Sequence, residues 1–139
     1  MRKVVWLILT LIIVGIIVGS IIWIYAFQKS DLSVVSRKVD YELKSSDLLK
    51  NFINNEDSAN KVFLDKIILV DGVIDKITED SLSISVYLKN PMEDSGVMCG
   101  FNKSTIDKSK FNPGKEVKIK GLCTGYLMDV VLNKCSLEK

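Results

Sequence analysis

The feature that most constrains this 139-residue sequence is an uncharged apolar run close to its start. Between Val4 and Phe27 there is no Asp, Glu, Lys or Arg, and only four small or hydroxylated residues interrupt the apolar ones. A helix of this length extends about 36 Å at 1.5 Å per residue. That is enough to cross a hydrocarbon core of about 30 Å. The sequence therefore predicts a transmembrane helix over residues 4–27.

Two other interpretations of this run are a buried helix of a soluble protein and a cleaved signal peptide. A signal peptide has an apolar region of about 7 to 15 residues followed by a small-x-small site, whereas this run is longer and ends in the poor site Tyr25-Ala26-Phe27. We expect an uncleaved signal anchor, with a short tail over residues 1–3 and a juxtamembrane linker over residues 28–44. A short amino-terminal tail is typical of single-pass proteins of the bacterial inner membrane with a cytoplasmic N-terminus. The C-terminal domain would then be periplasmic or otherwise extracytoplasmic.

Gly15 and Gly19 lie one helical turn apart within this run. Small residues at this spacing allow two membrane helices to approach closely. The pair predicts helix–helix packing in a homodimer, although glycine is also common in membrane helices by composition alone.

The part of the chain after residue 44 predicts one helix and then five strands. Apolar residues at helical spacing indicate an amphipathic helix over about Asp47–Lys61, with Ser45 or Ser46 as its N-cap. Alternation or short apolar runs then indicate strands. They lie near residues 66–77, 81–88, 97–101, 117–123 and 129–137.

The strand pattern favours a closed barrel. In the second strand we expect Leu82, Ile84, Val86 and Leu88 to point inward. Gly72 within the first strand predicts a bulge or a sharp coil. We predict a mainly β fold: a transmembrane helix followed by a five-stranded OB-fold β-barrel with a preceding amphipathic helix, the domain covering residues 45–139. A small β-sandwich is the alternative.

Several short stretches of the chain between about residue 46 and residue 137 carry a family resemblance. They are Asn55-Glu56, Ala59-Asn60, Lys66, Val70–Val73, Val97–Phe101, Pro113–Val117, Lys120–Gly125, Asp129–Leu132 and Cys135. The most specific part joins a Gly-x-Cys-x-Gly stretch to Asp-Val-Val-Leu. In these stretches the chain resembles the tRNA_anti-like family, OB-fold domains of uncharacterised bacterial proteins. The resemblance implies the fold and a membrane-associated or secreted setting, but no known activity.

The three cysteines, Cys99, Cys123 and Cys135, all fall in the predicted barrel. Cys123 and Cys135 flank the turn between the last two strands, so they are the disulfide candidates. Such a bridge would stabilise the domain by roughly 2 to 4 kcal/mol. A bridge that includes Cys99, or three reduced and buried thiols, are the alternatives.

The sequence contains no His and no recognisable catalytic or metal-binding motif, so we predict no enzyme activity, no metal site and no cofactor. All 17 acidic residues and all but two of the 19 basic residues follow Gln28, which makes that part formally neutral. A neutral domain lacks the basic footprint of nucleic-acid binders, so nucleic acid is not the expected partner.

A possible binding face combines Tyr87, Lys118, Lys120 and Tyr126. The two lysines belong to a locally basic stretch over residues 103–120, and the tyrosines could stack on a ligand. A solvated outer strand face is the simpler interpretation. The leading functional hypothesis is a membrane-tethered, non-enzymatic binding or interaction module for a protein, peptide or glycan. An oligonucleotide-binding domain and a structural accessory subunit of a membrane complex are the alternatives.

Overall fold

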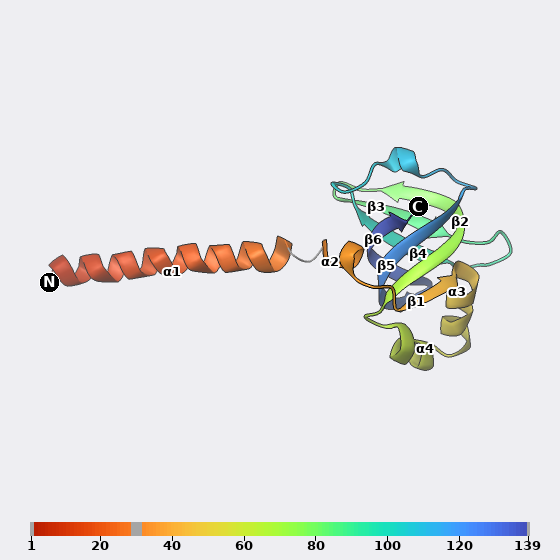
Figure 1. Cartoon of the computed structure of the whole chain (residues 1–139), viewed down its shortest axis with the longest axis horizontal. Coiled ribbons are helices and arrows are strands. Elements are labelled where there is room, and N and C mark those ends of the chain that lie inside the picture. Colours follow the sequence, from red (N-terminus) through yellow and green to blue (C-terminus); the bar gives the residue numbers. More distant parts are fainter. Residues whose placement is uncertain (1, 29–31, 139) are drawn as a thin grey trace. The chain divides into compact units, whose positions relative to one another are not determined.

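The computed structural model describes residues 2–28 and 32–138 of the chain (Figure 1). These fall into two compact units, Met1–Ser33 and Val34–Lys139. The first contains the long helix α1 (Arg2–Gln28), and the short helix α2 (Leu32–Ser36) spans the boundary. The described side chains of α1, those of Trp6 and residues 11–24, are exposed.

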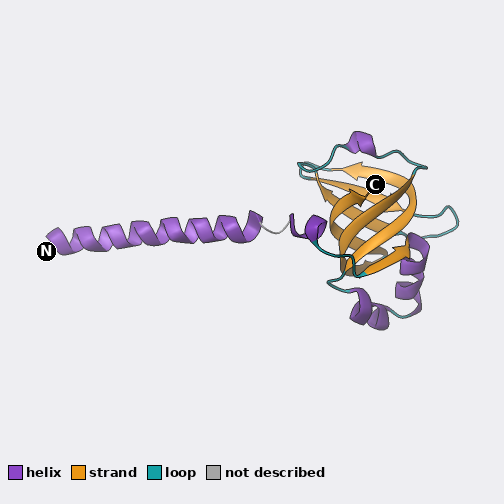
Figure 2. Cartoon of the chain, viewed as in Figure 1, coloured by secondary structure: helices purple, strands orange, loops and turns teal. Residues whose placement is uncertain are grey.

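The second unit is a closed barrel of five strands (Figure 2). Its strands pair in the order β2-β3-β4-β6-β5, and β5 pairs back with β2 to complete the ring. All neighbours are antiparallel except β4 and β6, which run parallel. The strands are β2 (Ile67–Glu79), β3 (Ser83–Leu88), β4 (Val97–Asn102), β5 (Glu116–Leu127) and β6 (Asp129–Glu138). The predicted five-stranded OB-type barrel is confirmed, and the sandwich alternative is wrong.

β2 is long because it pairs with two different strands of the barrel. Its first half pairs with β5 and its second half with β3, with a register shift between Ile74 and Lys76. The predicted irregularity therefore exists, but it lies after Gly72. At Gly72 itself, an added Cβ would lie 2.5 Å from the Ser45 Oγ. Glycine is present there because a helix packs directly against the strand.

A sixth strand, β1 (Tyr41–Lys44), lies in the segment that the sequence indicated as linker. It pairs in parallel with the first half of β2, from Tyr41 opposite Ile68 to Lys44 opposite Asp71. The Asp40 carboxylate accepts a hydrogen bond of 2.8 Å from the Ile67 backbone N–H at the start of this pairing. With only four residues and half-exposed side chains, β1 has too little alternation to be found by pattern alone.

The predicted helix over Asp47–Lys61 is two helices, α3 (Ser45–Asn54) and α4 (Glu56–Phe63). Asn55 separates them in an extended conformation, and its side chain accepts a hydrogen bond from the Ser58 N–H as the N-cap of α4. Ser45 is the first residue of α3 and not its cap. Because Asn favours caps over helix interiors, it ends one helix and begins the next.

The core fills the barrel and continues to α3. Leu48, Leu49 and Phe52 on one face of α3 are buried, and Phe52 packs against Phe63 at 6.1 Å and Tyr126 at 5.8 Å between ring centroids. In β3, the inward positions Ile84, Val86 and Leu88 are buried as predicted. Leu82 is not: it precedes the strand, in the turn, and its side chain is 80% exposed.

The transmembrane helix that the sequence predicted as part of the fold is not supported by the structure. Crossing a bilayer takes about 20 consecutive apolar residues in one helix. Among the residues that the structure describes, no helix combines the length and the apolar character for this.

The position of α3 gives a test of the core. We predict that Phe52→Ala lowers the free energy of unfolding of the full-length chain by about 3 to 5 kcal/mol, because it leaves a cavity against two other rings. Ile53→Ala on the adjacent exposed position should change it by less than about 0.5 kcal/mol. Urea unfolding followed by circular dichroism measures both. Similar losses for the two variants would contradict this account of α3.

Candidate ligand-binding face

On the outer surface of β2, β3 and β4, the side chains form rows that run across the three strands. Because Ile84, Val86 and Leu88 point inward, the intervening residues of β3 point outward. The register places Lys76 of β2 and Met98 of β4 on either side of Tyr87. We call this surface the tyrosine face. It comprises Lys76, Thr78, Ser83, Ser85, Tyr87, Met98, Gly100 and Asn102.

Tyr87 lies at the centre of one row of the tyrosine face. The Lys76 Nζ lies over its ring, 4.4 Å from the centroid. A cation at this distance is attracted by the ring quadrupole and also holds the ring in place. The row therefore presents an aromatic surface next to a positive charge, the pair of groups that stacks on a planar group and attracts an anion.

The next rows are small and uncharged. Thr78, Ser85 and Gly100 lie side by side, followed by Ser83 opposite Asn102. A Cβ on Gly100 would lie 3.0 Å from the Asn133 Oδ1 of β6, so glycine leaves room for this amide. These rows offer hydroxyl and amide groups for hydrogen bonds and no bulky side chain to obstruct an extended ligand.

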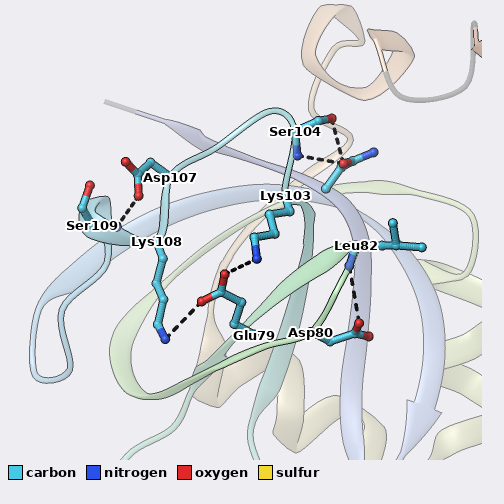
Figure 3. A network of polar contacts seen from close by, with 9 residues as sticks. Glu79, Asp80, Leu82, Lys103, Ser104, Asp107, Lys108 and Ser109 are labelled. Atoms are coloured by element: carbon cyan, nitrogen blue, oxygen red, sulfur yellow. Dashed lines mark hydrogen bonds and ion pairs between the residues drawn. The ribbon is translucent and has the colours of Figure 1, made fainter.

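A pocket of about 450 Å³ lies at the end of the barrel where β2 ends and β4 continues into its loop. Glu79 pairs with the inward-pointing Ile84, so both residues line the pocket from the inner side of the sheet and not from the tyrosine face. The Glu79 carboxylate forms ion pairs there with Lys103 and, at 3.3 Å, with Lys108 (Figure 3). Hydrogen bonds and the charges of these two lysines hold the pKa of Glu79 below its ordinary value. The carboxylate is therefore ionised at neutral pH.

The loop that carries Lys108 is ordered by its own hydrogen bonds. Asp107 accepts a bond of 2.9 Å from the Ser109 N–H at the start of the 3₁₀ turn η1 (Lys108–Lys110). Bonds from Ser109 lower the pKa of Asp107. On the β4 side, the Asn102 side chain accepts bonds from the backbone and hydroxyl of Ser104. The pocket is thus built on structured turns.

The predicted binding residues do not come together. Lys118 lies on β5 and pairs with Glu42 of β1 at 3.0 Å, and this bond raises the pKa of Lys118. The Lys120 side chain is buried, and its Nζ donates to the Val35 carbonyl at 3.0 Å. Tyr126 packs on Phe52 in the core cluster. Only Tyr87 lies on the tyrosine face.

Sequence reasoning missed Lys76, Glu79 and the pocket. The basic stretch over residues 103–120 was a correct signal for Lys103 and Lys108. However, only the fold shows that Glu79, from another strand, lies between them. Lys76 has no local signal, because the register shift in β2 decides which of its neighbours points outward.

The predicted disulfide is absent, since Cys99, Cys123 and Cys135 are all free and buried. The register of β5 and β6 places Cys123 opposite Leu132. Cys135 lies instead beside Gly121, where an added Cβ would be 2.6 Å from its Sγ. Flanking a turn in sequence does not make two residues cross-strand partners, because the register that starts with Leu127 opposite Asp129 does not bring Cys135 opposite Cys123.

Gly15 and Gly19 lie within α1, and a Cβ added at either would meet nothing within 4 Å. Their packing against a second helix concerns another copy of the chain, and stays a prediction. In the described part of the chain there is no cluster of three or more residues that could hold a metal ion.

The connectivity and the outward face define the class of the protein: its second unit is an OB-fold domain, with the parallel pair that closes such barrels. The chain belongs to the tRNA_anti-like family, whose sequence model matches residues 1–137. The resemblance noted in the sequence is thereby confirmed. The comparison with curated proteins gave no match.

Two of the solved structures that match this chain differ in how closely they resemble it. A crystal structure from Klebsiella pneumoniae subsp. pneumoniae MGH 78578, described as a "putative nucleic acid-binding lipoprotein", has a TM-score of 0.61 and 21% identity. The match covers 79% of this chain and 98% of that one. The S. pombe Stn1-Ten1 complex gives a TM-score of 0.38 and 14% identity over 52% of this chain and 58% of that chain. The first likeness supports the fold alone, and the second is too low to carry an argument.

The state of the thiols is open to a direct test. Burial raises the pKa of Cys123, and burial followed by a hydrogen bond with Cys99 raises that of Cys135 well above its ordinary value. Because the thiolate is the reactive form, we predict slow reaction of the native chain with Ellman's reagent at neutral pH. After denaturation without reductant, all three thiols should react. If only one thiol reacts after denaturation, the other two cysteines form a disulfide and the description of three free cysteines is wrong.

Proposed function

We propose that this chain is a non-enzymatic binding protein whose OB domain takes an extended ligand on the tyrosine face. The observation that carries the proposal is the Tyr87 ring, with Lys76 over it, on the outer side of the middle strands of the barrel. In OB domains this surface, with the loops beside it, binds oligonucleotides and oligosaccharides. The neighbouring rows are small and polar, so they leave space along the strands for a ligand.

Single-stranded nucleic acid is the ligand class that we propose first. A base can stack on a tyrosine ring whatever its identity, and a nearby lysine can pair with the adjoining phosphate. The description of the Klebsiella pneumoniae structure as a "putative nucleic acid-binding lipoprotein" supports this choice. It replaces the expectation from the sequence that nucleic acid is not the partner, which rested on net charge alone.

A neutral ligand, such as a peptide or a glycan, is the second candidate. One observation favours it: Lys103, Lys108 and Lys118 are each paired with a carboxylate of the chain itself. These charges therefore contribute less to attracting phosphate than their number in the sequence indicates. Serine, threonine and asparagine side chains on the tyrosine face suit hydrogen bonds to hydroxyl or amide groups.

The proposed function is tested by replacing the ring. We predict that Tyr87→Ala weakens binding of a fluorescein-labelled mixed-sequence single-stranded RNA or DNA 12-mer to the full-length chain by about 5- to 100-fold. Stacking contributes about 1 to 3 kcal/mol per base, and fluorescence anisotropy at low salt measures the loss. Tyr87→Phe keeps the ring and should bind within about twofold of the unmodified chain.

The controls separate the two ligand classes. Tyr126→Phe changes a ring that faces the core cluster, and should leave oligonucleotide binding unchanged. If the unmodified chain does not bind either oligonucleotide at low salt, single-stranded nucleic acid is rejected. The same Tyr87 variants are then compared for binding to immobilised glycans and peptides, where a loss specific to Tyr87→Ala would support the second candidate.

A further inference from the structure

The pocket at the end of the barrel contains two cations that converge on one acidic side chain. Lys103 follows β4, Lys108 begins η1, and Glu79 ends β2, so three separate segments meet there (Figure 3). The lysine side chains are 46% and 50% exposed, whereas that of Glu79 is 29% exposed. Both ammonium groups can therefore be reached from solvent, while the carboxylate lies deeper.

The lining of this pocket has the chemistry of an anion site. Besides the two paired lysines, it includes Lys110 and the hydroxyl residues Ser104 and Thr105. Lysine ammonium groups and hydroxyls are donors that phosphate oxygens accept from. Its volume of about 450 Å³ is within the range of small-ligand pockets. In the free chain, the negative charge between the lysines is supplied by Glu79.

We propose that this pocket is a phosphate subsite at the end of the barrel, beyond the last row of the tyrosine face, and that the Glu79 carboxylate is its internal occupant, which an incoming phosphate must displace from Lys103 and Lys108. The proposal rests on the proposed nucleic-acid ligand and deepens it. It assigns to Lys103 and Lys108 the role of binding phosphate, although both lysines are paired with Glu79 in the free chain. It also gives Glu79 the role of weakening the attraction of polyanions.

The spacing along β3 sets the length of ligand that the two sites share. Ser83 pairs with Asn102, the residue before Lys103 of the pocket, and Tyr87 lies four residues further along the strand. At about 3.3 Å per residue this is roughly 13 Å. A single nucleotide is too short to stack on Tyr87 and reach the pocket. A short oligonucleotide that follows the strand is long enough, which predicts a gain in affinity with length.

Neutralising Glu79 tests the proposal. We predict that Glu79→Gln tightens binding of the labelled 12-mer by threefold or more, since two lysines are released from their internal partner. The slope of log K against log salt should also steepen by about 0.7 for each phosphate newly contacted on a single strand. Equal affinity and equal slope for Glu79→Gln and the unmodified chain would overturn the phosphate subsite.

The matched control is Asp80→Asn. Asp80 is the next residue along the chain, and its substitution removes the same charge as Glu79→Gln. Its carboxylate accepts a hydrogen bond of 3.4 Å from the Leu82 N–H and is not among the ion pairs of the described residues. The substitution should leave the affinity nearly unchanged. If Asp80→Asn tightens binding as much as Glu79→Gln does, the effect is one of overall charge and the proposal is rejected. Adding Lys103→Gln and Lys108→Gln to Glu79→Gln should abolish the gain.

A second probe separates this proposal from the proposed function. Inorganic tripolyphosphate is titrated into the ¹⁵N-labelled Glu79→Gln chain, and amide shifts are followed by NMR. Saturable shifts confined to residues 103–110 and the end of β2 support the subsite, even if no oligonucleotide binds. Absence of such shifts rejects it. Loss of 12-mer binding in Tyr87→Ala, with no effect of Glu79→Gln, would keep the proposed function and overturn the subsite alone.

Discussion

The parallel pairing of β4 with β6 is the contact on which the domain depends. Val97, Met98 and Cys99 pair with Val130, Val131 and Leu132, and this short ladder converts an open sheet into a ring. Closure removes the exposed strand edges that a five-stranded sheet would otherwise present. It also fixes which side of every strand points inward. The tyrosine face exists because closure leaves the alternate residues of β2, β3 and β4 on one outer surface.

The parts of the fold that could be predicted from the sequence are those with a strong local pattern. Alternation located β3, and the apolar spacing located the helical region, because burial of one face imposes those periods. The spacing predicted one helix there, whereas the structure has α3 and α4. The parts that failed depend on contacts distant in sequence. β1 is defined by its pairing with β2, and the register of β5 and β6 does not bring Cys123 opposite Cys135. Leu82 continues the alternation by chance, although the strand has already ended.

In the candidate site, too, the sequence showed which charges are present, but not which distant residues they contact. Counting lysines located a basic stretch, but it gave no information on how each charge is used. Lys118 and Lys120 stabilise the attachment of β1 and α2 to the barrel, while Lys103 and Lys108 converge on a glutamate from another strand. Net charge was for this reason a poor guide to the ligand. The surface potential depends on which cations are already paired.

The bond from Lys120 to the Val35 carbonyl has a consequence for where the independent domain begins. Lys120 as a whole is only 7% exposed, and its ammonium group needs this hydrogen-bond partner, because a buried unpaired cation is costly. The segment from Val34 to Lys44 is accordingly part of the barrel's own structure. A fragment cut at Ser45 would lose both β1 and the acceptor for this lysine, so the natural boundary lies near Val34.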